Sequence, residues 1–175
     1  MTFLSTLVEH VDRCLRVLLA TLMALLVLDV TWQVTTRFIL TQPSSFTEEV
    51  ARFLLIWVSL IGGAYAYRLK SHLGFDLLIR NLSLAKAKFM FRLTCLLVAI
   101  FAIAVLIIGG GNLVHLTWTL GQFSPVLNVP MAYIYAVIPF SGVLFLLYSI
   151  VFFVDAELHV THTSSSDDTQ GKANG

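Results

Sequence analysis

Long apolar runs separated by short polar stretches dominate this chain. A membrane-spanning helix needs about 20 mainly apolar residues, and four stretches meet that requirement: residues 15–36, 49–67, 93–120 and 131–154. The last two come from one run, residues 93–154, which contains no Lys, Arg, Asp or Glu. Because that run is too long for one span, it predicts two spans joined by a turn. The pattern therefore predicts four transmembrane helices.

Turn-forming residues mark the breaks between these helices. Pro43 lies between the first two spans, and residues 121–130 carry the Gly, Ser, Asn and Pro residues that favour a turn between the last two. Pro139 falls inside the fourth span, where it should remove a backbone hydrogen bond and kink the helix. The glycine run at residues 109–111 fits either close packing or bending of the third span.

The segment between the second and third spans has a different pattern. Over residues 71–92, apolar side chains recur at helical spacing while polar residues, including Asp76, point elsewhere. The amphipathicity is moderate, and it favours a helix lying in the headgroup plane; a plain loop with some helix is the alternative. The polar tail, residues 155–175, lacks apolar periodicity and is predicted to be disordered.

The composition agrees with an all-α integral membrane protein. Hydrophobic residues make up 58% of the 175 residues and charged residues only 12%, whereas a soluble domain carries about 25% charged residues. The net charge of +1 argues against nucleic acid as a partner, since no basic surface is available to bind phosphates. Cys14 and Cys95 show no metal-ligand spacing, so we predict no metal site.

The distribution of Lys and Arg predicts the orientation. Nine of these residues fall on the side that holds both termini and residues 71–92, while only Arg37 and Arg52 fall on the other side. Because cytoplasmic loops carry the excess of positive charge, both termini and the amphipathic segment are predicted to face the cytoplasm.

The start of the second span carries a cluster of charged residues. Ser45 and Glu48 have the spacing of a capping box. Arg52 follows Glu48 by four residues and Glu49 by three, so both acids can reach it across one helix face. On physical grounds this is a capped helix with a solvated ion pair at the water boundary. A sharper hypothesis is an ion cluster that orients the second span at an interface.

Two further residues are candidates for chemistry within the membrane. Asp29 lies in the outer half of the first span, and three interpretations are open: a structural acid facing the interfacial layer, a contact with a partner subunit, or a transport group. His115 is the one histidine in the charge-free run, and haem binding would need further ligands that the sequence does not place near it. With no catalytic motif present, we predict no enzyme activity and no cofactor.

A set of short motifs follows the spans in a fixed order, and together they resemble one family. The motifs are Arg37-Phe38, Phe46-Thr47-Glu48-Glu49, Ala51-Arg52, Trp57, Gly63-Ala64, His72, Asp76, Gly121-Gln122-Phe123-Ser124-Pro125, Val129-Pro130, Tyr133 and Pro139. In this order they resemble the small membrane subunit of tripartite ATP-independent periplasmic (TRAP) transporters, the DctQ-like family. The resemblance covers about residues 15–154.

The resemblance implies an accessory role in the bacterial inner membrane. Members of this family pair with a large multispanning (DctM-like) subunit that holds the substrate and sodium sites and moves as an elevator. A periplasmic (DctP-like) binding protein delivers a carboxylate such as sialic acid or a C4-dicarboxylate. The small subunit would then widen the fixed scaffold, in contact with lipids, and need no cofactor of its own.

The resemblance and the positions of polar and small residues together indicate candidate contact residues. The partner and scaffold interface is predicted at Asp29, Arg37, Glu48, Glu49, Arg52, Trp57, Gly62 and Gly63, with His72 and Asp76 in the in-plane segment. Two rival functions are a self-sufficient homo-oligomeric carrier or channel that uses Asp29, and a membrane redox or sensor protein that uses His115.

Overall fold

The computed structural model describes residues 2–39, 45–81 and 84–153 of the chain, and all the regular structure within these ranges is helical. The helices are α1 (Thr2–Ile39), α2 (Ser45–Asn81), α3 (Leu84–Phe101), the π-helix η1 (Ala102–Gly109), α4 (Gly110–Thr119), α5 (Met131–Tyr135) and a final helix over residues 137–153. In a bilayer no water is available to backbone N–H and C=O groups, and a helix satisfies them internally.

Four of these helical stretches are long and apolar enough to cross a membrane, as the sequence predicts. They are Val8–Ile39, Ser45–Leu69, Phe89–Thr119 and Met131–Phe153. The third span is built from α3, η1 and α4 in direct succession, and the fourth from α5 and the final helix. The first span has 32 residues and the third 31, so each is over 45 Å long at 1.5 Å per residue. Both exceed a hydrocarbon core of about 30 Å, which favours tilted helices.

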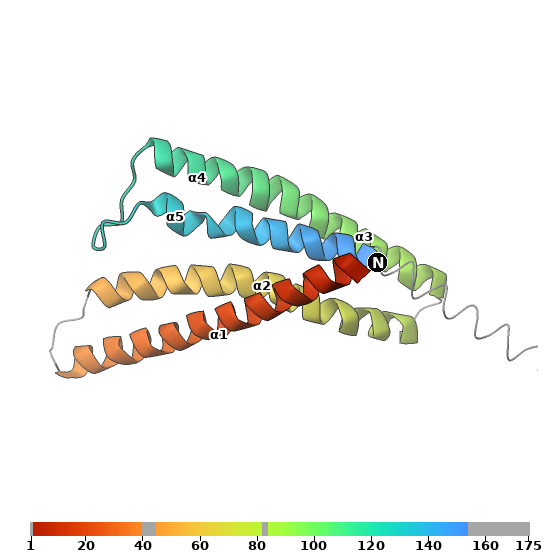
Figure 1. Ribbon diagram of the computed structural model, residues 1–175, viewed down its shortest axis with the longest axis horizontal. Helices are drawn as coiled ribbons and strands as arrows, with labels where there is room; N and C mark the ends of the chain where they lie inside the picture. Colours follow the sequence, from red (N-terminus) through yellow and green to blue (C-terminus); the bar gives the residue numbers. More distant parts are fainter. Residues whose placement is uncertain (1, 40–44, 82–83, 154–175) are drawn as a thin grey trace, which may run out of the picture.

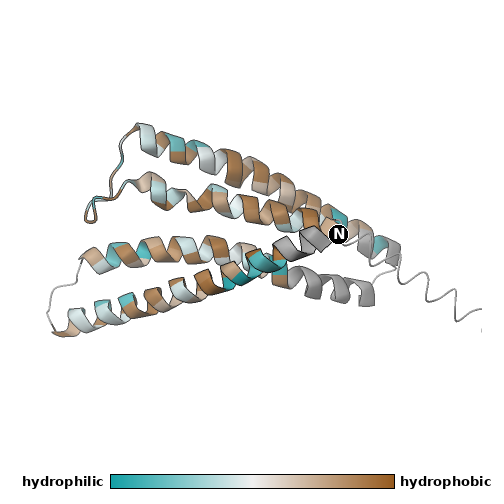
Figure 2. Ribbon diagram, in the orientation of Figure 1, coloured by the Kyte–Doolittle hydropathy of each residue, from teal (hydrophilic) through white to brown (hydrophobic). Residues whose placement is uncertain are grey.

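The spans form two helical hairpins that converge at one end of the molecule. Figure 1 shows α1 beside α2 and the third span beside the fourth, and the four spans converge near the N-terminus. We call this the N-terminal end, and we call the opposite end, which carries residues 121–130, the hairpin end. Most of each span has the colour of high hydropathy, and a hydrophilic stretch colours α1 close to the N-terminal end (Figure 2).

The buried core joins all four spans. It is made of buried, mainly apolar side chains supplied by each of them: Val8, Leu15, Ile61, Ala64, Cys95, Val137, Leu144, Tyr148 and Phe152. Trp57, one of the residues predicted at a partner interface, packs against this cluster while remaining partly exposed.

Two glycines bring the third and fourth spans into close contact. A Cβ atom on Gly110 would lie 2.7 Å from Ile138 Cγ2, and one on Gly142 would lie 2.7 Å from Leu106 Cβ and 3.2 Å from the Ile107 backbone nitrogen. Real side chains do not approach so closely, so only glycine fits at these positions. The glycine run in the third span therefore serves close packing through Gly110, and Gly142 is a partner that sequence reasoning missed.

The glycines of the second span do not approach their neighbours as closely. A Cβ on Gly62 would meet Leu19 Cδ2 at 3.7 Å, and one on Gly63 would meet Phe145 Cζ at 3.8 Å. Both are ordinary van der Waals distances, so neighbouring helices within the described chain do not require glycine there. Contact of Gly62 and Gly63 with a partner subunit stays a prediction.

The two predicted breaks in the last spans are present. At the end of α4 the Gly121 N–H bonds to the Trp118 carbonyl and the Gln122 N–H to the Thr117 carbonyl, with Gly121 at a φ of 58°. This is the Schellman arrangement, in which glycine takes the left-handed position at no steric cost. In the fourth span the α-helical pattern is interrupted at Ala136, where Pro139 leaves no N–H to bond the carbonyl of the preceding turn.

Several predictions are not settled by these helices. α2 runs without a break from the second span to Asn81, and the next helix begins at Leu84, so an in-plane orientation of residues 71–92 stays a prediction, as does the cytoplasmic placement of the termini. The side chains of His72 and Asp76, and the tail at residues 155–175, lie outside the described part of the chain.

Candidate functional site

At the hairpin end, Glu49 ties the second span to the turn between the third and fourth. Its Oε2 atom accepts hydrogen bonds from the backbone N–H groups of Leu127, at 2.8 Å, and Val126, at 3.2 Å. The Glu49 residue is only 5% exposed, and the buried Ser124 is another neighbour of its carboxylate. A carboxylate that caps two backbone N–H groups makes charge-assisted hydrogen bonds. Glu49 therefore fixes the hairpin against α2.

The predicted charge cluster at the start of α2 is divided between two faces. Arg52 Nη2 lies 3.5 Å from Glu48 Oε1, and these side chains are 65% and 58% exposed. Glu49 points instead to the hairpin and makes its hydrogen bonds there. The i, i+4 pair is present as the spacing suggests, whereas Glu49 acts as an internal cap. The hydrogen bonds of Glu49 to the hairpin are a role that sequence reasoning missed, and an interface role of Glu48, Glu49 and Arg52 stays a prediction.

The turn at residues 121–130, which we call the hairpin, is held by hydrogen bonds between its own backbone groups. The Ser124 N–H donates to the Val129 carbonyl at 2.9 Å and the Asn128 N–H to the Ser124 carbonyl at 3.1 Å. Asn128 has a φ of 54°, a left-handed conformation that asparagine tolerates better than most residues. The conformation places Val126 and Leu127 where their N–H groups reach Glu49.

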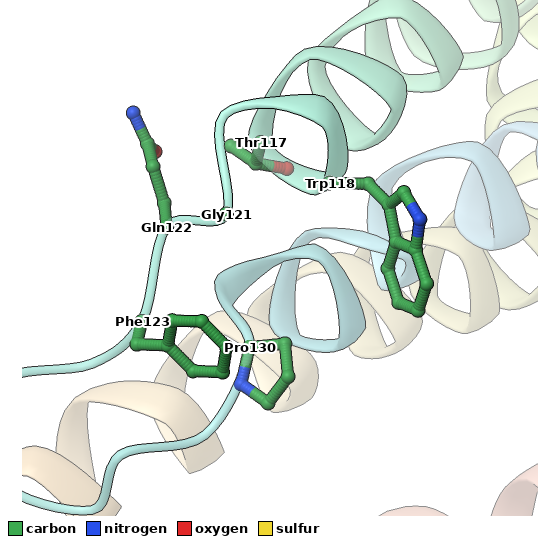
Figure 3. Close-up of a pocket in the computed structure, with 6 residues that line it drawn as sticks. All are labelled: Thr117, Trp118, Gly121, Gln122, Phe123 and Pro130. Atoms are coloured by element: carbon green, nitrogen blue, oxygen red, sulfur yellow. The ribbon is translucent and has the colours of Figure 1, made fainter.

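A small hollow lies beside the hairpin (Figure 3). It has a volume of about 160 Å³ and is lined by Thr117, Trp118, Gly121, Gln122, Phe123 and Pro130. The Trp118 and Tyr133 rings meet edge to face with centroids 5.9 Å apart, and Phe123 is exposed. No titratable side chain lines the hollow, so it suits contact with an apolar group of a partner and offers no acid or base for catalysis.

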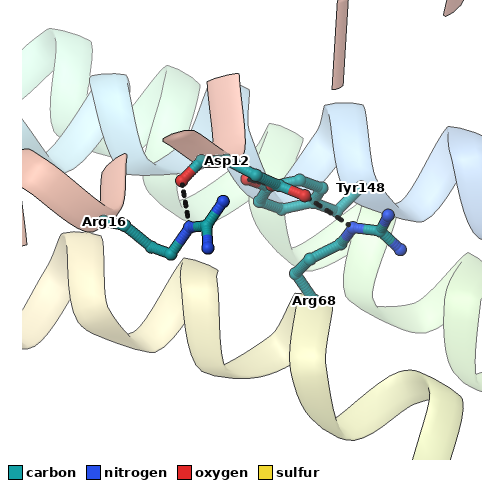
Figure 4. Close-up of polar contacts among 4 residues, drawn as sticks. All are labelled: Asp12, Arg16, Arg68 and Tyr148. Atoms are coloured by element: carbon teal, nitrogen blue, oxygen red, sulfur yellow. Dashed lines mark hydrogen bonds and ion pairs between the residues drawn. The ribbon is translucent and has the colours of Figure 1, made fainter. Parts of the chain in front are cut away.

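At the N-terminal end, a polar cluster joins three spans (Figure 4). Tyr148 Oη donates to Asp12 Oδ1 at 2.7 Å, and Arg68 Nε lies 3.4 Å from Asp12 Oδ2. Tyr148 is fully buried, while the Asp12 and Arg68 side chains are 19% and 20% exposed. Arg16 Nε also bonds the Asp12 backbone carbonyl at 3.4 Å. We call Asp12, Arg68 and Tyr148 the three-span cluster.

Aromatic contacts extend this cluster into the core. The Arg68 guanidinium lies 5.4 Å from the centre of the Phe152 ring, a cation–π distance. Tyr67 meets Phe152 edge to face at 5.6 Å, and its hydroxyl lies 3.3 Å from Ser149 Oγ. The N-terminal end is thus held by polar and aromatic contacts among the first, second and fourth spans. Sequence reasoning missed this cluster; the available signal was an acid and a base near the same ends of neighbouring spans.

Asp29 lies in a groove between α1 and α2. The groove has a volume of about 520 Å³ and is lined by Leu25, Leu28, Asp29, Trp32, Val50 and Leu54. Asp29 Oδ2 is buried and has no hydrogen-bond partner among the described residues. The carboxyl group therefore faces an otherwise apolar surface.

The remaining predicted site residues are not brought together. Arg37 is exposed near the end of α1, and His115 is exposed on α4. Within the described ranges, no three His, Cys, Asp or Glu side chains gather as metal ligands would. The polar residues instead form the separate contacts at the two ends and the Asp29 groove.

Four apolar spanning helices and these internal contacts define a multi-pass membrane protein. The family described as "Tripartite ATP-independent periplasmic transporters, DctQ component" matches residues 26–158, which is more than half of the chain. The chain belongs to this family and is a multi-pass protein of the inner membrane. The family is a permease component of a transporter, which is not an enzyme.

Curated relatives bear related names. A Haemophilus influenzae protein named as a TRAP transporter small permease is 22% identical over 141 residues, covering 81% of this chain and 86% of the relative. The sialic acid TRAP transporter small permease protein SiaQ of Vibrio cholerae is 45% identical over 51 residues, 29% of this chain and 30% of the relative. The C4-dicarboxylate TRAP transporter small permease protein DctQ of Rhodobacter capsulatus is 29% identical over 97 residues, 55% of this chain and 42% of the relative.

Proposed function

We propose that this chain braces a large transporter subunit that carries out sodium-coupled uptake of a carboxylate by an elevator movement. The observation that carries the proposal is the match to the DctQ family over residues 26–158. The first span also leaves a surface available to a partner, since only 6% of its most apolar stretch is buried within the chain. In a membrane, such an apolar surface must be covered by lipid or by another membrane protein. A brace needs this kind of face, and it needs its own helices to stay fixed.

The contacts at the two ends support a rigid role. Asp12 and Tyr148 join the first span to the fourth, and Glu49 joins the second span to the hairpin. Transport domains move between discrete arrangements, often at broken helices around a midplane site. Here the interruptions of the third and fourth spans pack on each other through Gly110 and Gly142. The structure thus favours a scaffold over a moving part.

The hairpin end offers a surface for the periplasmic substrate-binding protein. The distribution of Lys and Arg predicts cytoplasmic termini, and with that orientation residues 121–130 would face the periplasm. The hollow there exposes Phe123 and Trp118, which are of the aromatic type enriched at protein interfaces. The substrate is proposed as a carboxylate because two relatives are named for sialic acid and for C4-dicarboxylates.

Purification from native membranes tests this function. We expect a tagged chain to bring down one large multispanning membrane protein in a fixed ratio. In liposomes, the pair with its periplasmic binding protein should take up a carboxylate when a sodium gradient is applied, and this chain alone should transport nothing. Recovery of the chain without a large membrane partner would contradict the proposal.

The same liposomes separate the proposal from its main alternative, a homo-oligomeric carrier or channel that uses Asp29. If the purified chain alone moved a carboxylate or an ion, and replacing Asp29 abolished that movement, the alternative would be correct. The Asp29 carboxyl group favours this alternative only weakly, because it lies at a lateral groove between α1 and α2 rather than inside the bundle.

A further inference from the structure

The hydroxyl groups of α1 show how polar side chains are normally satisfied in this span. Thr31 Oγ1 donates to the Val27 carbonyl at 2.7 Å, and Thr35 Oγ1 donates to the Thr31 carbonyl at 2.7 Å. Thr36 Oγ1 bonds the Gln33 carbonyl at 3.0 Å. These local bonds allow a polar group to lie in the membrane at little cost. Asp29 is the exception on this helix, since its buried Oδ2 has no partner in the described residues.

Asp29 lies inside the first span rather than at its end. It lies ten residues before Ile39, the last residue of α1, which is about 15 Å along the helix axis at 1.5 Å per residue. Long Lys and Arg side chains can extend to the interface from such depths, but the short aspartate side chain cannot. Its neighbours in the groove supply no hydrogen-bond donor toward Oδ2.

We propose that the Asp29 groove receives a transmembrane helix of the large transporter subunit, and that a polar side chain on this helix donates a hydrogen bond to Asp29 Oδ2. This inference rests on the proposed function. The groove, at about 520 Å³, is large enough for several side chains of a packed helix. Leu25, Leu28 and Trp32 would form the apolar surround of the contact, with Val50 and Leu54 on the α2 side.

A helix suits this groove better than a lipid does. The acyl chains at this depth carry no hydrogen-bond donor, and headgroups that do carry donors lie at the interface. Apolar complementarity alone does not select a protein over lipid inside a bilayer, because lipid tails are as apolar as leucine. An unpaired carboxyl oxygen does favour a protein over lipid. A helix that carries a hydrogen-bond donor removes the energetic cost of leaving this oxygen unpaired, and a lipid tail does not.

Site-specific photocrosslinking tests the location of the contact. A benzoylphenylalanine at Leu28, which lines the groove, should form an adduct with a spanning segment of the large subunit in the intact complex. The control is the same group at Val30, which is also exposed and two residues away, but about 200° around the helix. We expect at least fivefold less large-subunit adduct at Val30.

Substitution of Asp29 tests the hydrogen bond. Asp29→Leu should weaken association with the large subunit about 5- to 30-fold, the effect of losing one interhelical hydrogen bond in a membrane. Asp29→Asn keeps an acceptor oxygen and should lose less. The chain alone should resist heat at least as well with Asp29→Leu, because the change removes an unsatisfied carboxyl group. A purely structural role predicts the opposite for the isolated chain.

The outcomes distinguish this inference from the proposed function. If the large subunit co-purifies normally but the Leu28 adducts are lipids or a second copy of this chain, the groove proposal is wrong and the brace stands. Unchanged association with both Asp29 variants also overturns the groove proposal. If no large subunit co-purifies at all, the proposed function fails first and the groove proposal fails with it.

Discussion

The first and fourth spans are both apolar helices, yet they use their surfaces in opposite ways. In the fourth span, Met131–Phe153, 39% of the most apolar stretch is buried within the chain, against 6% in the first span, Val8–Ile39. The fourth span supplies Val137, Leu144 and Tyr148 to the core. The first span touches that core mainly near its N-terminal end and leaves the rest of its surface to the membrane or to a partner.

This difference shows that apolar exposure alone does not reveal an interface in a membrane protein. Lipid covers an apolar helix as well as a protein does, so the long list of exposed aliphatic residues on α1 is compatible with either. Polar groups carry the information instead. On the fourth span they are satisfied inside the chain, as Tyr148 is by Asp12, whereas on the first span Asp29 keeps an unpaired oxygen.

The largest expected effect comes from cutting the polar link between the two spans. Asp12→Ala removes the acceptor of the fully buried Tyr148 hydroxyl and the partner of Arg68. We expect the free energy of unfolding to fall by about 2–4 kcal/mol, slightly less than for a fully buried pair because Asp12 and Arg68 remain partly exposed. Unfolding titrations in bicelles measure this. Asp12→Asn, which keeps an acceptor, should cost less; an equal loss would contradict the hydrogen-bond explanation.

A smaller loss should follow from a methyl group at the contact of the third and fourth spans. Gly142→Ala places a Cβ 2.7 Å from Leu106 Cβ and 2.9 Å from Ile107 Cγ1, so the two helices must separate. We expect about 1–3 kcal/mol lower stability, the usual cost of overpacking. Gly111→Ala is the matched control, because its Cβ would meet nothing within 4 Å. Equal stability of the two variants would show that the close approach is absent.

A local effect is expected at the hairpin end. Glu49→Ala leaves the Val126 and Leu127 N–H groups without the carboxylate that accepts from them, so their hydrogen exchange should accelerate by about tenfold, the loss of one hydrogen bond. Glu48→Ala is the control, since Glu48 lies on the exposed face with Arg52. Similar acceleration in both variants would mean that Glu49 does not hold the hairpin.

The sequence was sufficient for the helices and for contacts within one helix. Apolar runs predicted four spans, the Pro139 position predicted the interruption of the fourth span, and i, i+4 spacing predicted the Glu48–Arg52 pair, all of which the structure contains. These features depend on helix length and helical period, which are local properties of the chain.

Contacts between spans were not accessible in the same way. Glu49 meets a hairpin 77 residues later and Asp12 meets a tyrosine 136 residues later. Such pairings depend on how the helices rotate and cross, and a helical wheel does not determine that. Gly142 was missed because a single glycine in an apolar run looks the same whether it faces lipid or another helix; only the packed structure separates it from Gly111.

The smallest effect on the isolated chain is expected at Arg52. The Arg52–Glu48 pair is more than half exposed on both sides, so Arg52→Ala should change the free energy of unfolding by only about 0–1 kcal/mol. If the pair contacts the large subunit, as the sequence predicts, the same change should weaken association with that subunit by more than about 1 kcal/mol, because removing one half of an ion pair enclosed at an interface costs more than removing one half of an exposed pair. Co-purification and uptake assays on Arg52→Ala and Arg37→Ala measure the difference. Unchanged complex yield and transport with Arg52→Ala would show that the Glu48–Arg52 pair faces water and does not contact the large subunit. The Asp29 groove would then be the remaining proposed contact on α1 and α2.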